Sequence, residues 1–203
     1  LNSCKLPNRL YICQGMDKGR VIIGRKRFAL TLERLCQQLI EQHGGFERTC
    51  LIGIQPRGVF LSERLKQRLQ QLAGLPAIEH GKLDITFYRD DFRTRQKPLS
   101  ASRTELDFLV EGKKVILIDD VLYTGRTVQA ALTALNHYGR PEKVELLTLV
   151  DRRFNRHLPI QSDYVGLTVD AVDRAFVRVE WQEQQQEDRI LIFADKSEAE
   201  EQL

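Results

Sequence analysis

Residues 115–127 read Val115-Ile116-Leu117-Ile118-Asp119-Asp120-Val121-Leu122-Tyr123-Thr124-Gly125-Arg126-Thr127. The four apolar residues that begin this segment predict a strand buried on both faces, of the kind found in parallel sheets. Two adjacent carboxylates and a turn of small residues follow, and the apolar residues after Thr127 recur at helical spacing. Strand, turn and helix in this order predict an α/β fold.

The two aspartates of this segment predict a ligand site. Asp119 and Asp120 fall at the carboxyl end of the strand, where parallel sheets bind their ligands. The turn from Thr124 to Thr127 offers backbone N–H groups and two hydroxyls at the start of a helix, an arrangement that binds phosphate. Carboxylates accept hydrogen bonds from vicinal hydroxyls, so the segment as a whole predicts a pocket for a ribose 5-phosphate.

The same residues would also fit a helix cap and a tight turn without a ligand. Two adjacent acids cannot both cap one helix, however, and their mutual repulsion destabilises the folded chain unless a ligand uses them. We therefore favour the ligand site. A Walker A loop is excluded, because the chain lacks the GxxxxGK[ST] spacing of that loop.

Length and composition indicate one α/β domain. The chain has 203 residues, of which 42% are hydrophobic and 29% are charged, as in ordinary globular proteins. A net charge of +3 suits an anionic substrate but is too small to indicate nucleic-acid binding by itself. The four cysteines lack the spacing of a zinc site. No signal peptide and no apolar run of about 18 residues is visible, which predicts a cytoplasmic protein without a membrane span.

Apolar periodicity predicts strands that alternate with helices, and hence a mostly parallel sheet. Residues 1–19 show no clear period and predict an irregular arm, which leaves a single domain over residues 20–203. Residues 89–107 are polar and charged and predict a long loop, which in a compact domain is usually functional or mobile. The predicted strands are 21–23, 50–54, 84–88, 115–118, 144–150, 176–179 and 190–193, and the predicted helices are 26–43, 59–72 and 128–138.

Three further segments follow predicted strands, and we expect them to converge on the same crevice. The loop 55–58 combines a rigid turn with a cation and a glycine that permits close backbone approach, although a plain turn fits these residues equally well. Arg89 and Asp90 begin the long polar loop, which predicts a lid that excludes water from the ligand site. Asp151 and Arg152 end another strand, and their position suits recognition of a base.

Residues 119–127 resemble the phosphoribosyl pyrophosphate (PRPP) signature of the type I phosphoribosyltransferases. Over about residues 25–195, an ordered series of motifs resembles the pyrimidine-operon attenuation protein (PyrR) family. Members of that family often act as uracil phosphoribosyltransferases as well. The series comprises residues 84–91 (DITFYRDD), 119–127, 139–141, 149–152, 158–160 and 163–166.

The resemblance implies a type I phosphoribosyltransferase fold, in which helices flank a central, mostly parallel sheet and a small hood and a flexible lid loop adjoin the site. It implies that uracil and PRPP react to give UMP and pyrophosphate, with Mg²⁺ held mostly by substrate oxygens and water. We also expect a homo-oligomer, with apolar residues of the arm at an interface. The implied PRPP-binding residues are Asp119, Asp120, Val121, Leu122, Tyr123, Thr124, Gly125, Arg126 and Thr127, the pyrophosphate-binding residues are Arg57 and Gly58, the lid-side residues are Arg89 and Asp90, and the base-side residues are Asp151 and Arg152.

Departures from the family pattern leave the preferred base open. Residues 153–157 read Arg-Phe-Asn-Arg-His where the family commonly has Gly-His-Arg, and Leu167 replaces a lysine in a region expected to approach the base. Tyr123 stands where purine phosphoribosyltransferases usually carry an acid, which argues against a purine. A phosphoribosyltransferase for another base is therefore an alternative.

A second alternative is an RNA-binding transcriptional attenuator that senses pyrimidine nucleotides with little or no catalysis. RNA-binding members of the family often carry a Thr-Arg pair and a histidine on the first helix, where this chain has Glu33, Arg34 and Gln37. A carboxylate there would repel phosphates, which weakens the case for messenger RNA as a partner. Arginines 152, 153 and 156 are candidates to compensate for it.

Overall fold

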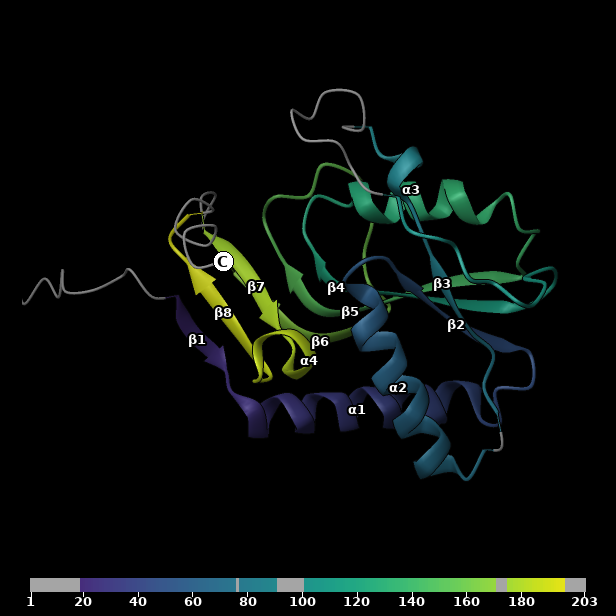
Figure 1. Cartoon of the computed structure of the whole chain (residues 1–203), viewed down its shortest axis with the longest axis horizontal. Helices are drawn as coiled ribbons and strands as arrows, with labels where there is room; N and C mark the ends of the chain where they lie inside the picture. The colour runs from purple at the N-terminus through teal and green to yellow at the C-terminus, as the bar shows by residue number, and fades with distance from the viewer. Residues whose placement is uncertain (1–18, 76, 91–100, 171–174, 196–203) are drawn as a thin grey trace, which may run out of the picture.

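A five-stranded parallel sheet forms the centre of the computed structural model, which describes residues 19–75, 77–90, 101–170 and 175–195 (Figure 1). Its strands are β2 (Thr49–Ile54), β3 (His80–Leu83), β4 (Lys114–Leu122), β5 (Lys143–Arg152) and β6 (Tyr164–Val169). They lie in the order β3-β2-β4-β5-β6. The main helices are α1 (Arg25–His43), α2 (Gly58–Ala73) and α3 (Arg126–Leu135). The α/β fold predicted from the sequence is therefore confirmed.

Alternate side chains of the central strand β4 belong to two separate apolar clusters, one on each face of the sheet. Ile116 and Ile118 pack with α1 and α2. Val115 and Leu117 pack with α3 on the opposite face. Figure 1 shows α1 and α2 below the sheet and α3 above it. Because successive side chains of a strand point to opposite faces, burial of both faces explains why this strand is a continuous apolar run.

A smaller sheet of three antiparallel strands lies beside the central sheet, and we call it the hood. Its strands are β1 (Arg20–Ile23), β7 (Phe176–Glu180) and β8 (Arg189–Phe193), in the order β1-β8-β7, with the short helix α4 (Gln182–Gln185) between β7 and β8. Apolar periodicity predicts all three strands, and their pairing confirms the hood that the resemblance implies.

One aromatic side chain joins the hood to the helices. Trp181, which has no exposed surface, follows β7 directly. Its ring centroid lies 5.5 Å from that of Phe28 in α1, edge to face, and 5.9 Å from that of Phe60 in α2. Aromatic pairs at these distances are favourable beyond the apolar area they bury, so the hood is packed firmly against α1 and α2.

The prediction of a strand at residues 84–88 is wrong. β3 ends at Leu83, and Thr86–Tyr88 form the 3₁₀ turn η1. The carboxylate of Asp84 explains the turn, because its Oδ1 accepts hydrogen bonds from the backbone N–H and the hydroxyl of Thr86 at 3.0 and 2.6 Å. The alternation in the sequence survives only as burial of Ile85 beside an exposed Phe87.

The strand β6 has no counterpart among the predicted elements. It is an edge strand that pairs with β5 alone. Only its first and last residues, Tyr164 and Val169, are buried, and the four residues between them are partly or fully exposed. An edge strand of this kind lacks the apolar run that marks β4, which is why periodicity does not detect it.

Some predicted features lie outside the described residues, namely residues 1–18 of the arm and residues 91–100 of the lid loop. The domain boundary, the flexibility of the lid and the oligomeric state therefore stay predictions. The described end of the loop runs beside β3, where Glu105 forms an isolated antiparallel bridge with Lys82. Each helix in the described part of the chain is too short or too polar to cross a bilayer.

Candidate active site

The side chains of the two aspartates at the end of β4 lie on opposite faces of the sheet. Both are buried, with 6% of Asp119 and 7% of Asp120 exposed. Asp119 continues the row of Val115 and Leu117 and lines a cavity at the start of α3. Asp120 continues the row of the isoleucines on the other face and contacts the loop that precedes α2. The period of two along a strand thus gives adjacent carboxylates different neighbours.

Burial and repulsion make this pair electrostatically unfavourable. Burial, and then the charge of Asp120, raise the pKa of the Asp119 carboxyl far above its ordinary value. The backbone N–H of Asp120 donates a hydrogen bond to Asp119 Oδ1 at 2.9 Å, which offsets part of this effect. Carboxylates kept at such a cost to stability are typical of functional sites.

The turn after β4 leads into α3 through a glycine in a left-handed conformation. Gly125 has φ = 91°, and α3 begins at the next residue, Arg126. The backbone carbonyl of Thr124 accepts hydrogen bonds from the N–H groups of His157 and Leu158 at 3.0 and 3.2 Å, so a second loop supports the turn. The start of α3, where the first backbone N–H groups of a helix lack intrahelical acceptors, therefore lies in a supported turn that suits phosphate.

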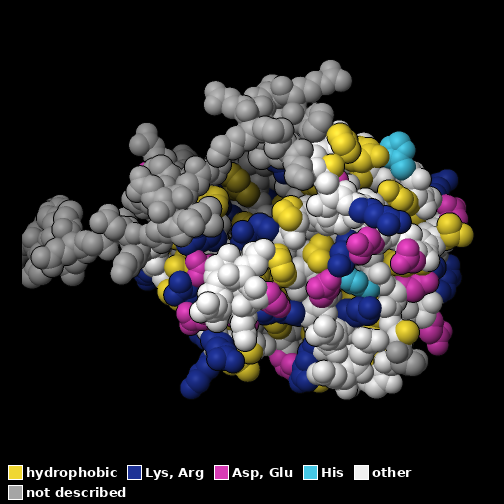
Figure 2. Space-filling model, in the orientation of Figure 1, with side chains coloured by type: hydrophobic (Ala, Val, Ile, Leu, Met, Phe, Trp, Pro, Cys, Tyr) yellow, Lys and Arg dark blue, Asp and Glu magenta, His cyan; other side chains and the backbone are white. Residues whose placement is uncertain are grey.

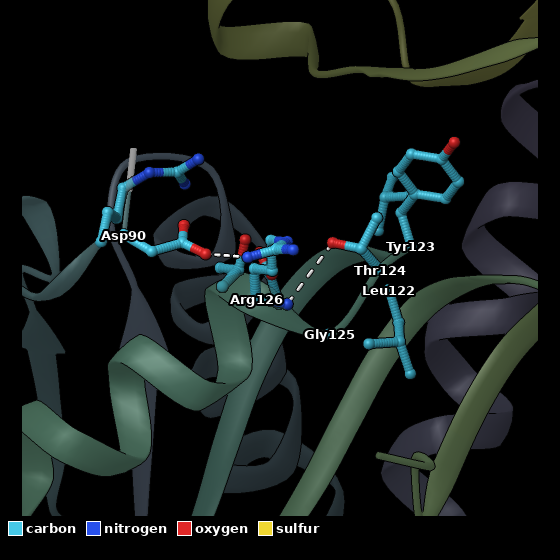
Figure 3. A pocket seen from close by; sticks show the side chains of 10 residues that line it. Asp90, Leu122, Tyr123, Thr124, Gly125 and Arg126 are labelled. Atoms are coloured by element: carbon cyan, nitrogen blue, oxygen red, sulfur yellow. Dashed lines mark hydrogen bonds and ion pairs between the residues drawn. The ribbon is translucent and has the colours of Figure 1, made fainter. Parts of the chain in front are cut away.

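A cavity of about 460 Å³ lies over this turn (Figure 3). The turn and the end of β4 form one wall, and Arg89 and Asp90 of the predicted lid form another. The carboxylate of Asp90 pairs with the guanidinium of Arg126 across the cavity, as Figure 3 shows. The residues that line it are Arg89, Asp90, Asp119, Val121, Leu122, Tyr123, Thr124, Gly125, Arg126 and Thr127.

A second cavity, of about 240 Å³, lies between the end of β4 and the hood. It shares Val121 and Tyr123 with the larger cavity, so the two are neighbours along one crevice. The guanidinium carbon of Arg152 lies 4.0 Å from the centroid of the Tyr123 ring, close enough for a cation–π contact. The residues that line it are Arg57, Asp120, Val121, Tyr123, Arg152, Phe176, Val177 and Arg178.

The loop 55–58 reaches the smaller cavity through Arg57. Its Nε donates to Asp120 Oδ2 at 2.5 Å, and its Nη2 donates to the backbone carbonyl of Val179 in the hood. Gly58 has the close approach predicted for it, because a Cβ at this position would lie 2.2 Å from the carbonyl oxygen of Ile118. The roles of Arg57 and Gly58 toward pyrophosphate stay predictions.

Two residues expected near a base have other neighbours. Asp151 accepts a hydrogen bond from Arg156 Nη2 at 2.5 Å, and Arg156 also donates to the carbonyl of Tyr123. Asp151 thus supports the wall of the crevice through Arg156 and lines neither cavity. Leu167 lies in β6, where it packs against the apolar cluster that contains α1. The departure at Leu167 therefore carries no argument about the base.

The sequence offers no direct sign of the hood's part in the site. Phe176, Val177 and Arg178 line the smaller cavity, yet in the sequence they are only the start of a short apolar strand. Residue 179, which accepts a hydrogen bond from Arg57, lies 122 positions away from it along the chain. Pairings over such separations depend on tertiary packing, which local periodicity does not encode.

The arrangement fits a magnesium ion that arrives with a phosphorylated substrate. Within the described ranges, no group of three or more His, Cys, Asp or Glu side chains could hold a metal ion. Asp119 and Asp120 instead offer one carboxyl group to each of the two neighbouring cavities. Mg²⁺ commonly binds through one or two carboxylates together with phosphate oxygens and water.

Comparison with known proteins agrees with this geometry. A family model described as phosphoribosyl transferase domain matches residues 23–184. The bifunctional protein PyrR of Bacillus cereus (strain AH820) is 39% identical over 180 residues, which cover 88% of this chain and 99% of that protein. The bifunctional protein PyrR of Caldicellulosiruptor bescii is 39% identical over 177 residues, which cover 87% of this chain and 96% of the relative.

Solved structures share the fold at lower identity. A hypoxanthine phosphoribosyltransferase from Staphylococcus aureus has a TM-score of 0.64 at 21% identity, and the match covers 86% of this chain and 92% of that one. The hypoxanthine phosphoribosyltransferase of Trypanosoma cruzi has a TM-score of 0.66 at 14% identity, with 89% and 99% covered. At such identities these structures support the fold alone.

Proposed function

We propose that this chain, which belongs to the phosphoribosyl transferase domain family and within it to the PyrR family, transfers the phosphoribosyl group of PRPP to uracil. The products are UMP and pyrophosphate. The resemblance to the PyrR family favours uracil as the base. Tyr123, which stands where purine enzymes usually carry an acid, disfavours a purine.

One observation carries this proposal: the crevice has two parts that meet at the end of β4. Asp119 lines the larger part and Asp120 lines the smaller part, while Val121 and Tyr123 line both. A phosphoribosyl group needs an anion site and a base site joined by a place for the ribose. The phosphate turn lies in the larger cavity, and the aromatic and hood residues lie in the smaller one.

We assign the substrate groups accordingly. The 5-phosphate binds the backbone N–H groups and hydroxyls of residues 124–127. The ribose hydroxyls donate to Asp119 and Asp120, with Val121, Leu122 and Tyr123 as the remaining PRPP-binding residues. Pyrophosphate binds at Arg57 and Gly58 with help from Arg89 on the lid side, and uracil lies near Arg152 beside the hood.

The reaction requires positioning more than acid–base groups. A bond forms between a ring nitrogen of uracil and C1 of the ribose, the bond from C1 to the pyrophosphate oxygen breaks, and the proton of that nitrogen passes to the departing pyrophosphate. The transition state carries positive charge on the ribose, which the negative charge of the buried Asp119–Asp120 pair stabilises. Mg²⁺, when bound with PRPP, neutralises charge on the departing pyrophosphate.

The first test is nucleotide formation from PRPP and Mg²⁺ with uracil, hypoxanthine, guanine and orotate offered separately. We expect UMP from uracil and its near loss in Asp120→Asn. Glu142→Gln is the matched control, since Glu142 is a half-exposed carboxylate that pairs with Arg48 at the start of β5. No turnover with any base would refute the enzymatic proposal, and rapid turnover with another base would replace uracil.

An RNA-binding regulator is the second candidate, and one contact at α1 favours it. Arg68 donates to both carboxylate oxygens of Glu33, at 2.6 and 2.7 Å, so the charge that would repel RNA is paired. Arg25, Lys26 and Arg27 are all exposed at the start of the same helix. Phosphate contacts by such cations supply most non-specific affinity for RNA.

Other observations limit this candidate. Arg153 pairs with Asp170 and Arg156 pairs with Asp151, so two of the arginines expected to compensate are already engaged. On the face shown in Figure 2, basic and acidic side chains are intermixed and form no continuous basic patch. Binding of a structured leader RNA, with Arg27→Gln expected to weaken it, tests the regulator directly. Equal binding by wild type and variant would remove α1 as the RNA surface.

A further inference from the structure

The loop before α2 is fixed in place by its contact with β4. A side chain at Gly58 would clash with the backbone of Ile118 and Asp119, because its Cβ would lie 2.2 and 3.1 Å from them. Arg57, the preceding residue, is the N-cap of α2. The backbone next to Arg57 therefore packs directly against the end of β4, close to the two aspartates.

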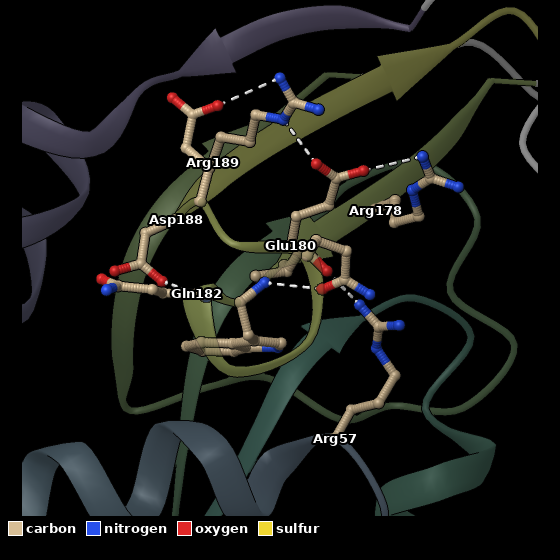
Figure 4. A network of polar contacts seen from close by, with 10 residues as sticks. Arg57, Arg178, Glu180, Gln182, Asp188 and Arg189 are labelled. Atoms are coloured by element: carbon tan, nitrogen blue, oxygen red, sulfur yellow. Dashed lines mark hydrogen bonds and ion pairs between the residues drawn. The ribbon is translucent and has the colours of Figure 1, made fainter. Parts of the chain in front are cut away.

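The guanidinium of Arg57 adds a polar bridge between the end of β4 and the hood, which line the same cavity. One nitrogen, Nε, pairs with Asp120 Oδ2 at 2.5 Å, and another, Nη2, donates to the carbonyl of Val179 in the hood. Figure 4 shows Arg57 extending from the core toward the hood. The side chain of Asp120 is 9% exposed and that of Arg57 is 38% exposed, so the pair is only partly screened by water.

The hood does not depend on this bridge for its attachment. Arg64, two turns further along α2, donates to both carboxylate oxygens of Glu183 at 2.9 and 2.6 Å and to Asp188 at 2.8 Å. Its guanidinium carbon also lies 5.1 Å from the centroid of the Trp181 ring. The hood is thus held at α4 by a separate arginine, and the Arg57 bridge is available for another role.

We propose that Arg57 is a positioning residue that couples the base site to the ribose site. A base in the smaller cavity contacts β7 at residues 176–178, next to Val179, and the guanidinium carries a shift of the Val179 carbonyl to Asp120. The planar group has fixed angles between its N–H bonds, so it transmits geometry that a flexible ammonium cannot. Occupation of the base site by uracil then strengthens binding of the ribose, and the reverse follows by linkage.

This inference rests on the proposed function, in which Asp120 receives the ribose hydroxyls. The test uses a pair of ligands that cannot react, uracil and ribose 5-phosphate, because the latter has no pyrophosphate to lose. Calorimetric titration of the whole chain gives the Kd of ribose 5-phosphate with and without saturating uracil. In the wild type we expect uracil to lower this Kd by about fivefold or more, a typical coupling.

Two variants of Arg57 separate its geometry from its charge. In Arg57→Gln the ratio of the two Kd values falls to about one, because the guanidinium bridge between Asp120 and the Val179 carbonyl is lost. In Arg57→Lys the charge beside Asp120 remains, so ribose 5-phosphate still binds, yet the ratio also falls because an ammonium does not present the same fork. A ratio in Arg57→Lys equal to that of the wild type would overturn the geometric role.

Two control variants complete the design. Arg68→Gln removes an arginine of the same helix that pairs with Glu33, and its ratio should match the wild type. Arg64→Gln loosens the hood without touching Asp120. If the ratio of the two Kd values falls to about one in Arg64→Gln, as it does in Arg57→Gln, the coupling depends on attachment of the hood in general. The role given to Arg57 is then wrong.

The outcomes also separate this inference from the proposed function. A wild type that makes UMP, but whose Kd for ribose 5-phosphate ignores uracil, sinks the coupling and leaves the enzyme intact. A wild type that makes no nucleotide and binds no ribose 5-phosphate removes both. Activity measurements support the split, since loss of coupling should raise KM for uracil more than it lowers kcat at saturation.

Discussion

Arg152 lies over the face of Tyr123, with its guanidinium carbon 4.0 Å from the ring centroid. Arg152 is 4% exposed, and both residues line the smaller cavity. The stack gives the cavity one rigid wall that is aromatic and cationic together. A flat heterocycle with carbonyl oxygens that accept hydrogen bonds, such as uracil, suits a wall of this kind.

Replacing Arg152 by lysine should weaken base binding. A lysine keeps the charge but loses the planar group that stacks on Tyr123, and contacts of this kind are worth about 1–2 kcal/mol when desolvated. We expect KM for uracil to rise by about tenfold in Arg152→Lys, with KM for PRPP nearly unchanged. Steady-state rates with each substrate varied would show this. Tyr123→Phe keeps the ring and should stay close to the wild type, and an equal effect in both variants would contradict the stacking argument.

Removing the charge of Asp119 should stabilise the protein while it weakens activity. Burial raises the pKa of Asp119 to about 8, so the folded chain holds this proton more tightly than the unfolded chain does. Stability is therefore lost as the pH rises from the ordinary aspartate value toward the folded value, and the whole loss is present above it. We expect Asp119→Asn to raise the free energy of unfolding by on the order of 1 kcal/mol near pH 8.

The pH dependence of that gain is its own control. Near pH 5 the wild-type carboxyl is protonated in the folded state, so the difference between Asp119→Asn and wild type should shrink. Denaturant unfolding at both pH values would measure it. A gain that is the same at both values would mean that the ionisation of Asp119 does not limit stability.

A methyl group at Gly125 should disturb the phosphate turn. Gly125 has φ = 91°, where a residue with a Cβ is strained by about 1–2 kcal/mol, and the added carbon would lie 3.3 Å from the Ile160 side chain. We expect Gly125→Ala to lose affinity for ribose 5-phosphate by roughly tenfold. Gly24→Ala is the matched control, because Gly24 has φ = −97° and a Cβ added there would have no neighbour within 4 Å. Unchanged binding in Gly125→Ala would show that the turn tolerates a shift.

Truncation of Trp181 should detach the hood. Its side chain is fully buried between Phe28 and Phe60, and removal of a buried tryptophan costs about 3–5 kcal/mol. Trp181→Ala should unfold at a lower denaturant concentration than the wild type. It should lose more affinity for uracil than for phosphate. Trp181→Phe keeps an aromatic ring and should recover most of both losses. A hood that stays protected from proteolysis in Trp181→Ala would contradict the anchoring role.

The central sheet can be predicted from local sequence, because the residues of each central strand match the burial of that strand. β4 is apolar from Val115 to Ile118 because both of its faces are covered there, and its turn and helix follow within a dozen residues. The same logic finds β2 and β5. It fails at Asp84, where a side-chain hydrogen bond to Thr86 turns an alternating segment away from the sheet. It also fails at β6, whose residues are mostly exposed.

The residues of the site also differ in how well local sequence predicts them. The PRPP segment is contiguous, so its residues could be named together, and the structure brings most of them around one cavity. The hood residues of the smaller cavity are joined to Arg57 and Tyr123 only in three dimensions. Asp151 shows what a strand end leaves open, because that position gives the place of the backbone and not the pairing of the side chain with Arg156.

The alternating rows of β4 also constrain how this gene can change. Substitution of one aliphatic residue for another in the strand would leave each row facing its own cluster. Insertion or deletion of a single codon before Asp119 would reverse the rows, and would exchange the neighbours of Asp119 and Asp120 along with them. The strand should therefore tolerate many aliphatic substitutions but no change of length. In a library of single-residue insertions and deletions, active variants should be missing across residues 115–120.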